Sequence, residues 1–499
     1  MALNVEHLLR TANTLEQALL ALRQHSRPDD VMFDLFRNAA IKSFELSLET
    51  ASKLLRKALK AYSGNPRSVD ALVALTDGGR ALTVAVSTLP DGRGNVHWHE
   101  ISKSPIVGPD GELNLLPFAA LIDGATGEFN QTLVMQVPAE VTEADVLVVL
   151  QAVLDRHAML RLRVDGFPDA DWALRTAEPG AVRAQDCLRS VPALSGEAMR
   201  IARASLDPAT GAMVSALWAA PTGQLALTIH HLAVDAVSWR ILLEDLNVAW
   251  LQSRAGQPVE IPVSGTSFQR WAQVLIEHAT APEVVAQAET WRQAAVTPAL
   301  LPAIEPERDT FATAGQLSVT LDDVDTVQTL LREAPAAFHA GINDVLLIGF
   351  ALAVAEFVSG SRTIGIDVEG HGRHDELAEH LDLSRTVGWF TTKYPVAVTV
   401  GDVSWAQVCS GDAALAAVVK DAKEQLRALP EGLTYGLLRY LNDDIDLETA
   451  DPVIGFNYLG RLGGGAELSD ELWQVGRDGS AGITGVATAV PMPLMHTVE

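Results

Sequence analysis

Two adjacent histidines and a nearby aspartate stand in the segment 225–246, LALTIHHLAVDAVSWRILLEDL. His230 and His231 follow an apolar run, and Asp235 comes shortly after them. An imidazole titrates near neutral pH, so a histidine that is held at an element junction and faces a cavity suits general acid–base chemistry. Paired histidines in a loop also commonly contact solvent or backbone groups. The wider pattern favours the chemical interpretation.

The elements that must position these histidines are a strand and a helix. Apolar residues alternate over 225–229, which predicts a buried strand that ends at the two histidines. Asp235 and Ser238 are suited to the first turn of a helix. The helix is predicted to bury an apolar stripe formed by Val237, Ile241, Leu242 and Leu246.

The same segment resembles the HHxxxDxxSW motif of the epimerization domains of nonribosomal peptide synthetases, a branch of the condensation-domain superfamily. The motif positions are His230, His231, Asp235, Ser238 and Trp239. Further motifs of that family follow in the family's order and together cover roughly residues 111–499. They are RHAMLRLRV from Arg156, SFQRWA from Ser267, FHAGINDVLL from Phe338, VEGHGRH from Val368, DLSRTVGWF from Asp382, YGLLRY from Tyr435 and FNYLGRLG from Phe456.

Condensation domains share the double histidine and join two carrier-bound acyl groups through an amide. They usually have glycine after the motif aspartate, whereas this chain has Ala236 and continues to Ser238 and Trp239. The blocks EGHGR, SRTVGWF and FNYLG are also marks of the epimerizing branch. The resemblance therefore favours an epimerase.

Inverting an amino acid held as a thioester requires removal of the α-proton and its return to the opposite face. By resemblance, His231 and Glu369 are the two proton-handling groups, and His230 is assigned to the same catalytic group. Backbone N–H groups, Asn457 or the Tyr458 hydroxyl would stabilise the enolate, and Tyr458 is also a candidate for moving the proton. The alternatives are a surface pair of Glu369 with Arg373 and a core role for Tyr458.

Other motif residues are assigned to supporting roles. The resemblance implies that Asp235 forms a buried ion pair with Arg161 of the RHAMLR block and so fixes the histidine loop. Ser238, Trp239 and Asn457 are placed in the same support. Arg385 and Trp389 of SRTVGWF are expected to line the substrate tunnel or to pack beneath it.

The resemblance implies an α/β fold of two chloramphenicol-acetyltransferase-like lobes set as a V, with the active site in a tunnel between them. We predict a helical segment at 1–65, a linker at 66–110, a first lobe at 111–296, an inter-lobe linker at 297–309 and a second lobe at 310–499. The family's opening block is replaced by LNLLPFAALIDG. The family normally continues beyond MPLMHTVE, so we expect the second lobe to be incomplete.

The composition agrees with a soluble enzyme of the reduced cytoplasm. The net charge of -26 and the pI near 4.8 argue against binding nucleic acid or an anionic membrane. Cys187 and Cys409 are too few and too far apart in the sequence to indicate a disulfide framework or a zinc site. The apolar stretch 342–358 contains Asn343 and Asp344 and is predicted to be a buried core helix. The start of the chain lacks the pattern of a secretion signal.

The expected partner is a peptidyl carrier protein, on another chain or a further segment, which presents the substrate on 4'-phosphopantetheine. The chain has no sequence of the Gly-Gly-x-Ser-Leu type that could receive this arm. The reaction itself requires no metal or bound cofactor.

The helical start resembles the substrate-binding helical partner of minimal nucleotidyltransferases, through Phe44, Glu45, Glu49 and Lys53. An amphipathic two-helix hairpin explains the same pattern. Three hypotheses for the whole chain remain open: an epimerase, a condensation-type acyltransferase, and an inactive fragment of a synthetase.

Overall fold

The computed structural model of the chain describes residues 82–88, 129–165, 173–261, 265–297, 300–302, 305, 308–309, 315–321, 323–358, 361–447, 451–460, 471–475 and 494–498. The predicted helical segment at 1–65 and the replaced opening block lie outside these residues, as does most of the predicted linker at 66–110. The chain divides into two compact units. One contains 1–80, 323–340 and 463–472, and the other contains 81–322, 341–462 and 473–499.

In the first of these units, the described residues form a helical segment with a wide turn in its middle. It consists of α10 (Val324–Gln328), a π-helical turn (Thr329–Glu333) and α11 (Ala334–Phe338). The Asp323 side chain caps its start by accepting a bond from the Thr326 backbone N–H at 3.0 Å. His339, with φ of 51°, adopts the left-handed conformation that ends it.

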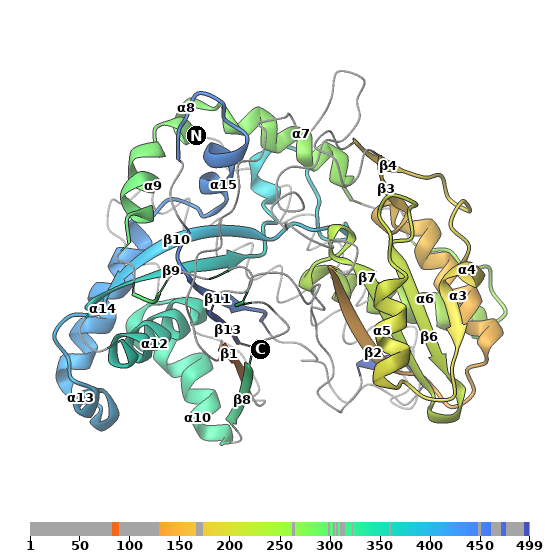
Figure 1. The fold of residues 1–499 in the computed structure, drawn as a ribbon, viewed down its shortest axis with the longest axis horizontal. Coiled ribbons are helices and arrows are strands. Elements are labelled where there is room, and N and C mark those ends of the chain that lie inside the picture. The colour runs from red at the N-terminus through yellow and green to blue at the C-terminus, as the bar shows by residue number, and fades with distance from the viewer. Residues whose placement is uncertain are drawn as a thin grey trace, which may run out of the picture. The chain divides into compact units, whose positions relative to one another are not determined.

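The second unit contains two sheets, shown in Figure 1. The first-lobe sheet has the order β12 (Gln474–Val475), β2 (Asn130–Gln136), β7 (Gln224–His230), β6 (Val214–Ala219) and β5 (Leu188–Ser190). Its neighbours are antiparallel except β5 and β6, which are parallel. A separate hairpin pairs β3 (Leu162–Asp165) with β4 (Ala173–Thr176).

The predicted strand before the histidines is β7, and both of its faces are buried. Leu225, Leu227 and Ile229 belong to the main core with α3 (Glu143–Arg156) and α6 (Ala236–Arg254). Ala226 packs on the other face in a smaller cluster with residues of α5 (Gly196–Ala204). The predicted helix is α6, and both elements therefore confirm the prediction from the sequence.

The second-lobe sheet has the order β10 (Thr392–Thr399), β9 (Thr363–Gly370), β11 (Ile454–Tyr458), β13 (Leu494–Val498), β1 (Leu82–Thr88) and β8 (Gly315–Leu321). β11 is parallel to β9 and to β13, and the other pairs are antiparallel. β1 lies within the segment that was predicted to be a linker, 66–110. It pairs with β8 and β13, so this part of the predicted linker is a strand of the second-lobe sheet.

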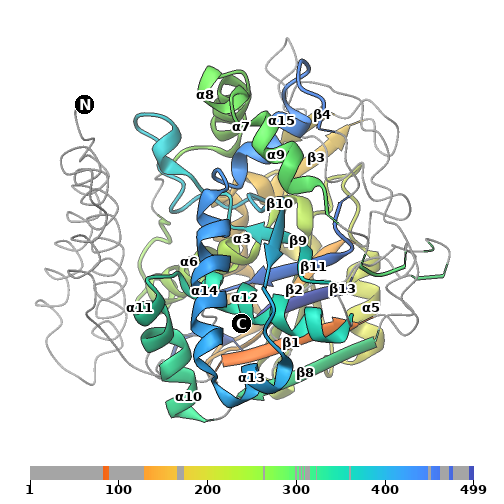
Figure 2. The same cartoon turned by 90° about the vertical axis from the view of Figure 1, so that its left-hand side faces the viewer.

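Helices α12 (Ile342–Phe357) and α14 (Ala413–Ala428) pack on this sheet and lie beside one another in Figure 2. The predicted core helix is α12, which buries one side through Leu347, Ile348, Ala351 and Leu352 and leaves Phe357 exposed. The other helices of the unit are α4 (Ala184–Cys187), α7 (Phe268–Ala279), α8 (Pro282–Val285), α9 (Ala288–Ala295), α13 (Trp405–Ser410) and α15 (Leu433–Tyr440).

No single helix in the described part of the chain is long and apolar enough to cross a membrane. The bent pair Val324–Phe338 and Ile342–Phe357 passes that test together, on length and composition alone.

Candidate active site

The two motif histidines lie where β7 ends, and their side chains have different surroundings. His230 is the last residue of β7 and is 1% exposed. Its Nδ1 accepts a hydrogen bond from the Leu232 backbone N–H at 3.2 Å, which caps the short turn that follows the strand. This bond ties one ring nitrogen of His230 to the loop that carries His231.

His231 is held between aromatic rings and a side-chain amide. Its ring stacks on Phe129 at a centroid distance of 4.7 Å and contacts Trp389 at 4.5 Å. Its Nε2 lies 2.9 Å from the Gln131 amide nitrogen. Burial lowers the pKa of His231 to about 4, so the ring is neutral at pH 7. A neutral imidazole has a lone pair and can accept a proton.

Asp235 is buried and fixes the loop that follows His231. One of its oxygens accepts the Ser238 backbone N–H at 2.7 Å, which caps α6. The Arg373 Nη2 donates to the same carboxylate at 3.1 Å, and the Phe390 backbone N–H donates to its other oxygen at 3.1 Å. The predicted buried ion pair exists, but its cation is Arg373.

The predicted pair between Asp235 and Arg161 is therefore wrong. Arg161 donates to the backbone carbonyls of Leu154, Asp155 and Ala177. Two of these carbonyls lie in the last turn of α3, which has unpaired carbonyl groups that attract a cation. The guanidinium of Arg161 is thus used to end α3.

Ser238 has no hydrogen-bonding capacity left for substrate. Its hydroxyl donates to the Gly388 carbonyl at 3.0 Å and accepts from the Gly388 N–H and the Arg373 Nη2, both at 3.1 Å. A hydroxyl offers one donor and two acceptor positions, and all three are occupied. A Cβ at position 388 would come within 2.5 Å of the Phe268 ring, so glycine permits this close approach.

Arg385 holds the segment 382–390 to the side of α6. It donates to Glu244 at 2.6 Å and also pairs with Asp245, which is buried and receives His157 Nε2 at 2.8 Å. Arg385 therefore holds the segment 382–390 to the middle of α6. Ser238 and Asp235 hold the same segment to the start of that helix. This segment carries Trp389, which contacts the ring of His231.

Glu369 lies near the end of β9 and bonds to Asn457. The Asn457 Nδ2 donates to its carboxylate at 2.5 Å, one residue beyond the parallel pair of Phe456 with Val368. The alternative of a surface pair with Arg373 is wrong, because Arg373 is used by Asp235. Burial, and then the charge of Asp367, raise the pKa of Glu369 to about 7. A carboxyl with a pKa near neutrality is suited to give and take a proton.

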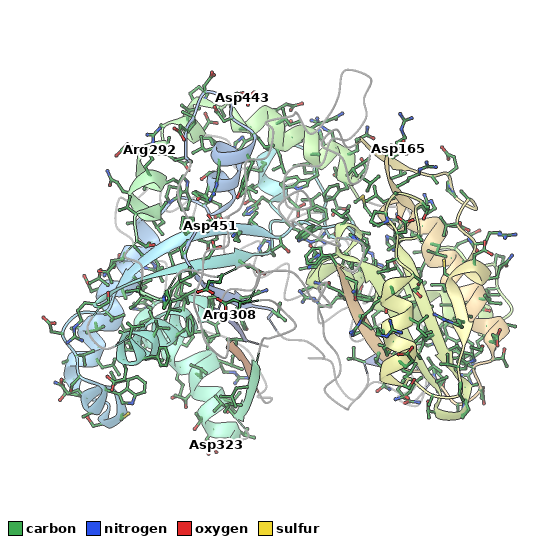
Figure 3. All side chains as sticks on the ribbon, in the orientation of Figure 1. Asp165, Arg292, Arg308, Asp323, Asp443 and Asp451 are labelled. Carbon is green, nitrogen blue, oxygen red and sulfur yellow. The ribbon has the colours of Figure 1, made fainter. Side chains whose placement is uncertain are left out.

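Behind Glu369 lies a buried cluster of charges, one member of which, Asp451, is labelled in Figure 3. Lys393 Nζ lies 2.6 Å from Asp367 and 2.9 Å from Asp451, which also pairs with Arg439. Burial raises the pKa of Asp367 to about 6, although Lys393 acts against it. Burial opposes the charge of Lys393, but Asp367 and Asp451 keep its pKa above the usual value.

Tyr458 is not on the same face of the sheet as Glu369. Successive strand residues point to opposite faces, and Asn457 is the one that bonds Glu369. Tyr458 follows it and shares the face of Phe456, whose ring contacts Phe350 of α12. The strand geometry therefore does not bring the Tyr458 hydroxyl together with Glu369 and Asn457.

The described contacts form two groups, one around His231 and one around Glu369, with no direct bond between them. The two groups are close along the chain. Arg373 is four residues after Glu369, and four residues of fully extended chain span about 14 Å. Arg373 then bonds Asp235, which belongs to the histidine loop. Gly372, with φ of 66°, lies against the Phe390 carbonyl and leaves no room for a Cβ.

Two residues that contact His231 were not predicted from the sequence. Gln131 bonds His231 from β2, and Phe129 stacks on the same ring from just before that strand. The only signal was the run of polar residues at 130–132, just before the apolar LVM, which by itself predicts no partner. Among the described residues, no group of three His, Cys, Asp or Glu side chains is arranged to hold a metal ion.

The fold matches a solved epimerization domain from the third module of tyrocidine synthetase B. The TM-score is 0.64 at 26% identity, over 77% of this chain and 87% of that one. The X-domain from teicoplanin biosynthesis shares the fold, with a TM-score of 0.50 at 17% identity over 76% of this chain and 86% of that one. The chain is thus an α/β protein with the predicted chloramphenicol-acetyltransferase-like lobes.

The sequence matches the Condensation domain family over residues 212–481. It is 36% identical to a linear gramicidin synthase of Brevibacillus parabrevis over 379 residues, which are 70% of this chain and 5% of that protein. It is also 36% identical to chondramide synthase cmdD of Chondromyces crocatus over 356 residues, 67% of this chain and 9% of that protein. The chain belongs to the condensation-domain superfamily of nonribosomal peptide synthetases.

Proposed function

We propose that this domain epimerizes an aminoacyl or peptidyl residue held as a thioester on the phosphopantetheine arm of a carrier protein. The observation that carries the proposal is the placement of Glu369 near the end of β9, where this half-buried carboxyl bonds Asn457 and has a pKa raised to about 7. Amide formation requires no such second proton-handling group. The similarity to a solved epimerization domain supports the same function.

In the proposed reaction, His231 and Glu369 exchange one proton each with the α-carbon. The neutral His231 takes the α-proton, and the electron pair of the C–H bond forms the thioester enolate. The protonated Glu369 then returns a proton to the opposite face of the α-carbon. After one inversion His231 holds the proton and Glu369 is ionised, so the pair carries the same number of protons as before, and proton exchange with solvent restores the starting state.

The partners in this proposal are a carrier protein and the other modules of a synthetase. The substrate arrives on the carrier, and the chemistry uses no bound cofactor or metal. Asn457 bonds Glu369, and Asp235 fixes the loop of His231. The matching relatives are many times longer than this chain, so the assembly in which the domain works belongs to the proposal.

The test is mass-detected deuterium uptake at the α-carbon of a carrier-bound aminoacyl thioester in heavy water. Uptake should be lost in His231→Ala and in Glu369→Gln. The control Glu424→Gln changes an exposed carboxylate of α14 and should keep the wild-type rate.

The second candidate is amide formation, which the match to the Condensation domain family favours. It predicts amide product when two loaded carriers are supplied, and no deuterium uptake. A folded chain that gave neither deuterium uptake nor amide would instead be an inactive domain.

A further inference from the structure

Gln131 connects His231 to Trp239 through two side-chain hydrogen bonds. The Trp239 indole N–H donates to the Gln131 Oε1 at 2.8 Å, and the Gln131 amide nitrogen lies 2.9 Å from the His231 Nε2. Gln131 lies in β2 and is 7% exposed, whereas Trp239 lies in the first turn of α6. Three elements therefore meet at one glutamine amide.

The direction of these bonds follows from the chemistry of the three groups. An indole N–H can only donate, so the atom of Gln131 that faces Trp239 must be its oxygen. The NH₂ group then faces His231, and it too can only donate. The His231 Nε2 must accept this bond, so it carries the lone pair and Nδ1 carries the proton.

The other side of the ring does not oppose this assignment. The Nδ1 of His231 is buried and has no hydrogen-bond partner among the described residues. Backbone groups of His231 and Val234 lie close enough to raise the pKa of the ring, and the bond at Nε2 is the side-chain contact that distinguishes the two tautomers. The stacking with Phe129 at 10° between ring planes also keeps the imidazole from turning.

We propose that Gln131 is a positioning residue, which fixes His231 as the neutral Nδ1–H tautomer with its lone pair on Nε2. The consequence for catalysis rests on the proposed epimerization. Nε2 is then the atom that bonds the α-proton as the C–H bond breaks. In the resting domain the Gln131 amide occupies that lone pair, and substrate must displace it.

The first test is nitrogen NMR of the full-length chain labelled with ¹⁵N-histidine, because the two tautomers give different imidazole nitrogen shifts. The His231 signals are assigned by their loss in His231→Ala. In the wild type we expect Nε2 to be the unprotonated nitrogen. A wild-type signal from the Nε2–H tautomer would overturn the proposal without any variant.

Gln131→Glu replaces the donor with a carboxylate that demands a proton on Nε2. We expect the His231 signal to change to a protonated Nε2, and deuterium uptake to fall by about tenfold or more, as when a catalytic histidine is held in the wrong tautomer. The matched control Gln136→Glu lies on the same strand, where its side chain is exposed and bonds two carbonyls. It should leave both readouts unchanged.

Trp239→Phe keeps an aromatic ring and removes the N–H that orients the Gln131 amide. We expect His231 to lose its single tautomer in this variant even though Gln131 is present. If Gln131→Glu fails to fold, as judged by its melting curve, this variant and the wild-type signal still decide the proposal. An unchanged His231 signal in a folded Trp239→Phe chain contradicts the proposal that Trp239 orients the Gln131 amide and thereby fixes the His231 tautomer.

The two proposals fail in different ways. The expected tautomer in a chain that takes up no deuterium would leave the positioning role intact and remove the epimerase function. Deuterium uptake by a chain whose His231 carries its proton on Nε2 would support the epimerase function and remove the positioning role of Gln131.

Discussion

The side chains of Glu369 and His231 are perturbed in opposite directions by the same cause, burial. Burial raises the pKa of the carboxyl to about 7 and lowers that of the imidazole to about 4. Between these values the stable state is a protonated Glu369 and a neutral His231. This is one acid and one base, which is the state that the proposed proton exchange requires.

The rate of deuterium uptake should therefore fall as pH rises through about 7, where Glu369 loses its proton. Asp367→Asn removes the neighbouring charge that raises this pKa, so the alkaline limb should move to lower pH. The measurement is the uptake rate from pH 5 to 9 for both chains. A limb that stays in place in the variant would show that another group controls the rate.

Glu369 also makes stability depend on pH. Its folded pKa lies above the ordinary value near 4.5, so the folded state holds the proton more tightly. Its stabilising contribution is complete below about pH 4.5 and is lost as pH rises through about 7. Glu369→Gln removes this loss, and it should be more stable than the wild type at pH 8, by about 3 kcal/mol at most, while being inactive.

The check is urea unfolding of both chains at pH 5 and at pH 8. The difference between the two chains should be larger at pH 8. An equal difference at both values would mean that Glu369 does not titrate over this range in the folded state.

At the scale of elements, Arg373 joins the start of α6, which follows the loop of His231, to the segment 382–390. Its guanidinium donates to Asp235 and Ser238 of the helix start, and to the carbonyls of Leu383 and Thr386 in the segment 382–390. It also lies 3.9 Å from the centre of the Phe390 ring. The loop of His231 is therefore stabilised by one buried cation.

Arg373→Ala should destabilise the domain by about 3–5 kcal/mol, because it leaves the Asp235 carboxylate buried without its cation. Asp235→Ala leaves the cation unpaired and should cost a similar amount, so both should lose activity through the fold. Chemical unfolding measures the cost. An Asp235→Ala chain with a normal melting temperature and no activity would contradict this account.

The sequence predicts local parts of this arrangement well. The alternation over 225–229 predicts β7, and Asp235 predicts the start of α6, because both depend on near neighbours. The cation that pairs with Asp235 lies 138 residues away, and it depends on how the segment 382–390 packs. The resemblance named Arg161 instead, and no periodicity distinguishes two arginines. Gln131 was missed for the same reason, since its partners are 100 and 108 residues away.

At the scale of the whole molecule, each of the two large sheets contains a strand from outside the sequence range of its lobe. β1 comes before the first lobe but belongs to the second-lobe sheet, and β12 comes after most of the second lobe but completes the first-lobe sheet. Contiguous boundaries such as 111–296 and 310–499 cannot describe this exchange. It depends on pairings between distant segments, which a pattern within one segment does not reveal.

The return of the chain to the first-lobe sheet is secured by Trp473, which precedes β12. Its ring is fully buried in the main core. Its backbone N–H and carbonyl bond the Asn247 side chain of α6, at 2.8 Å and 3.0 Å. α6 is also the helix whose start carries Asp235, so the helix that supports the histidine loop is held at a second place by a distant part of the chain.

Trp473→Ala should therefore destabilise the first-lobe core by about 3–5 kcal/mol, as removal of a large buried ring does. Trp473→Phe is the matched control and should cost much less, because it keeps an aromatic ring and removes an indole N–H that has no partner among the described residues. Hydrogen exchange of α3 and α6 measures the effect. Faster exchange of both helices in Trp473→Ala alone is expected, and protection that stays at the wild-type level would show that the first-lobe core is stable without this ring.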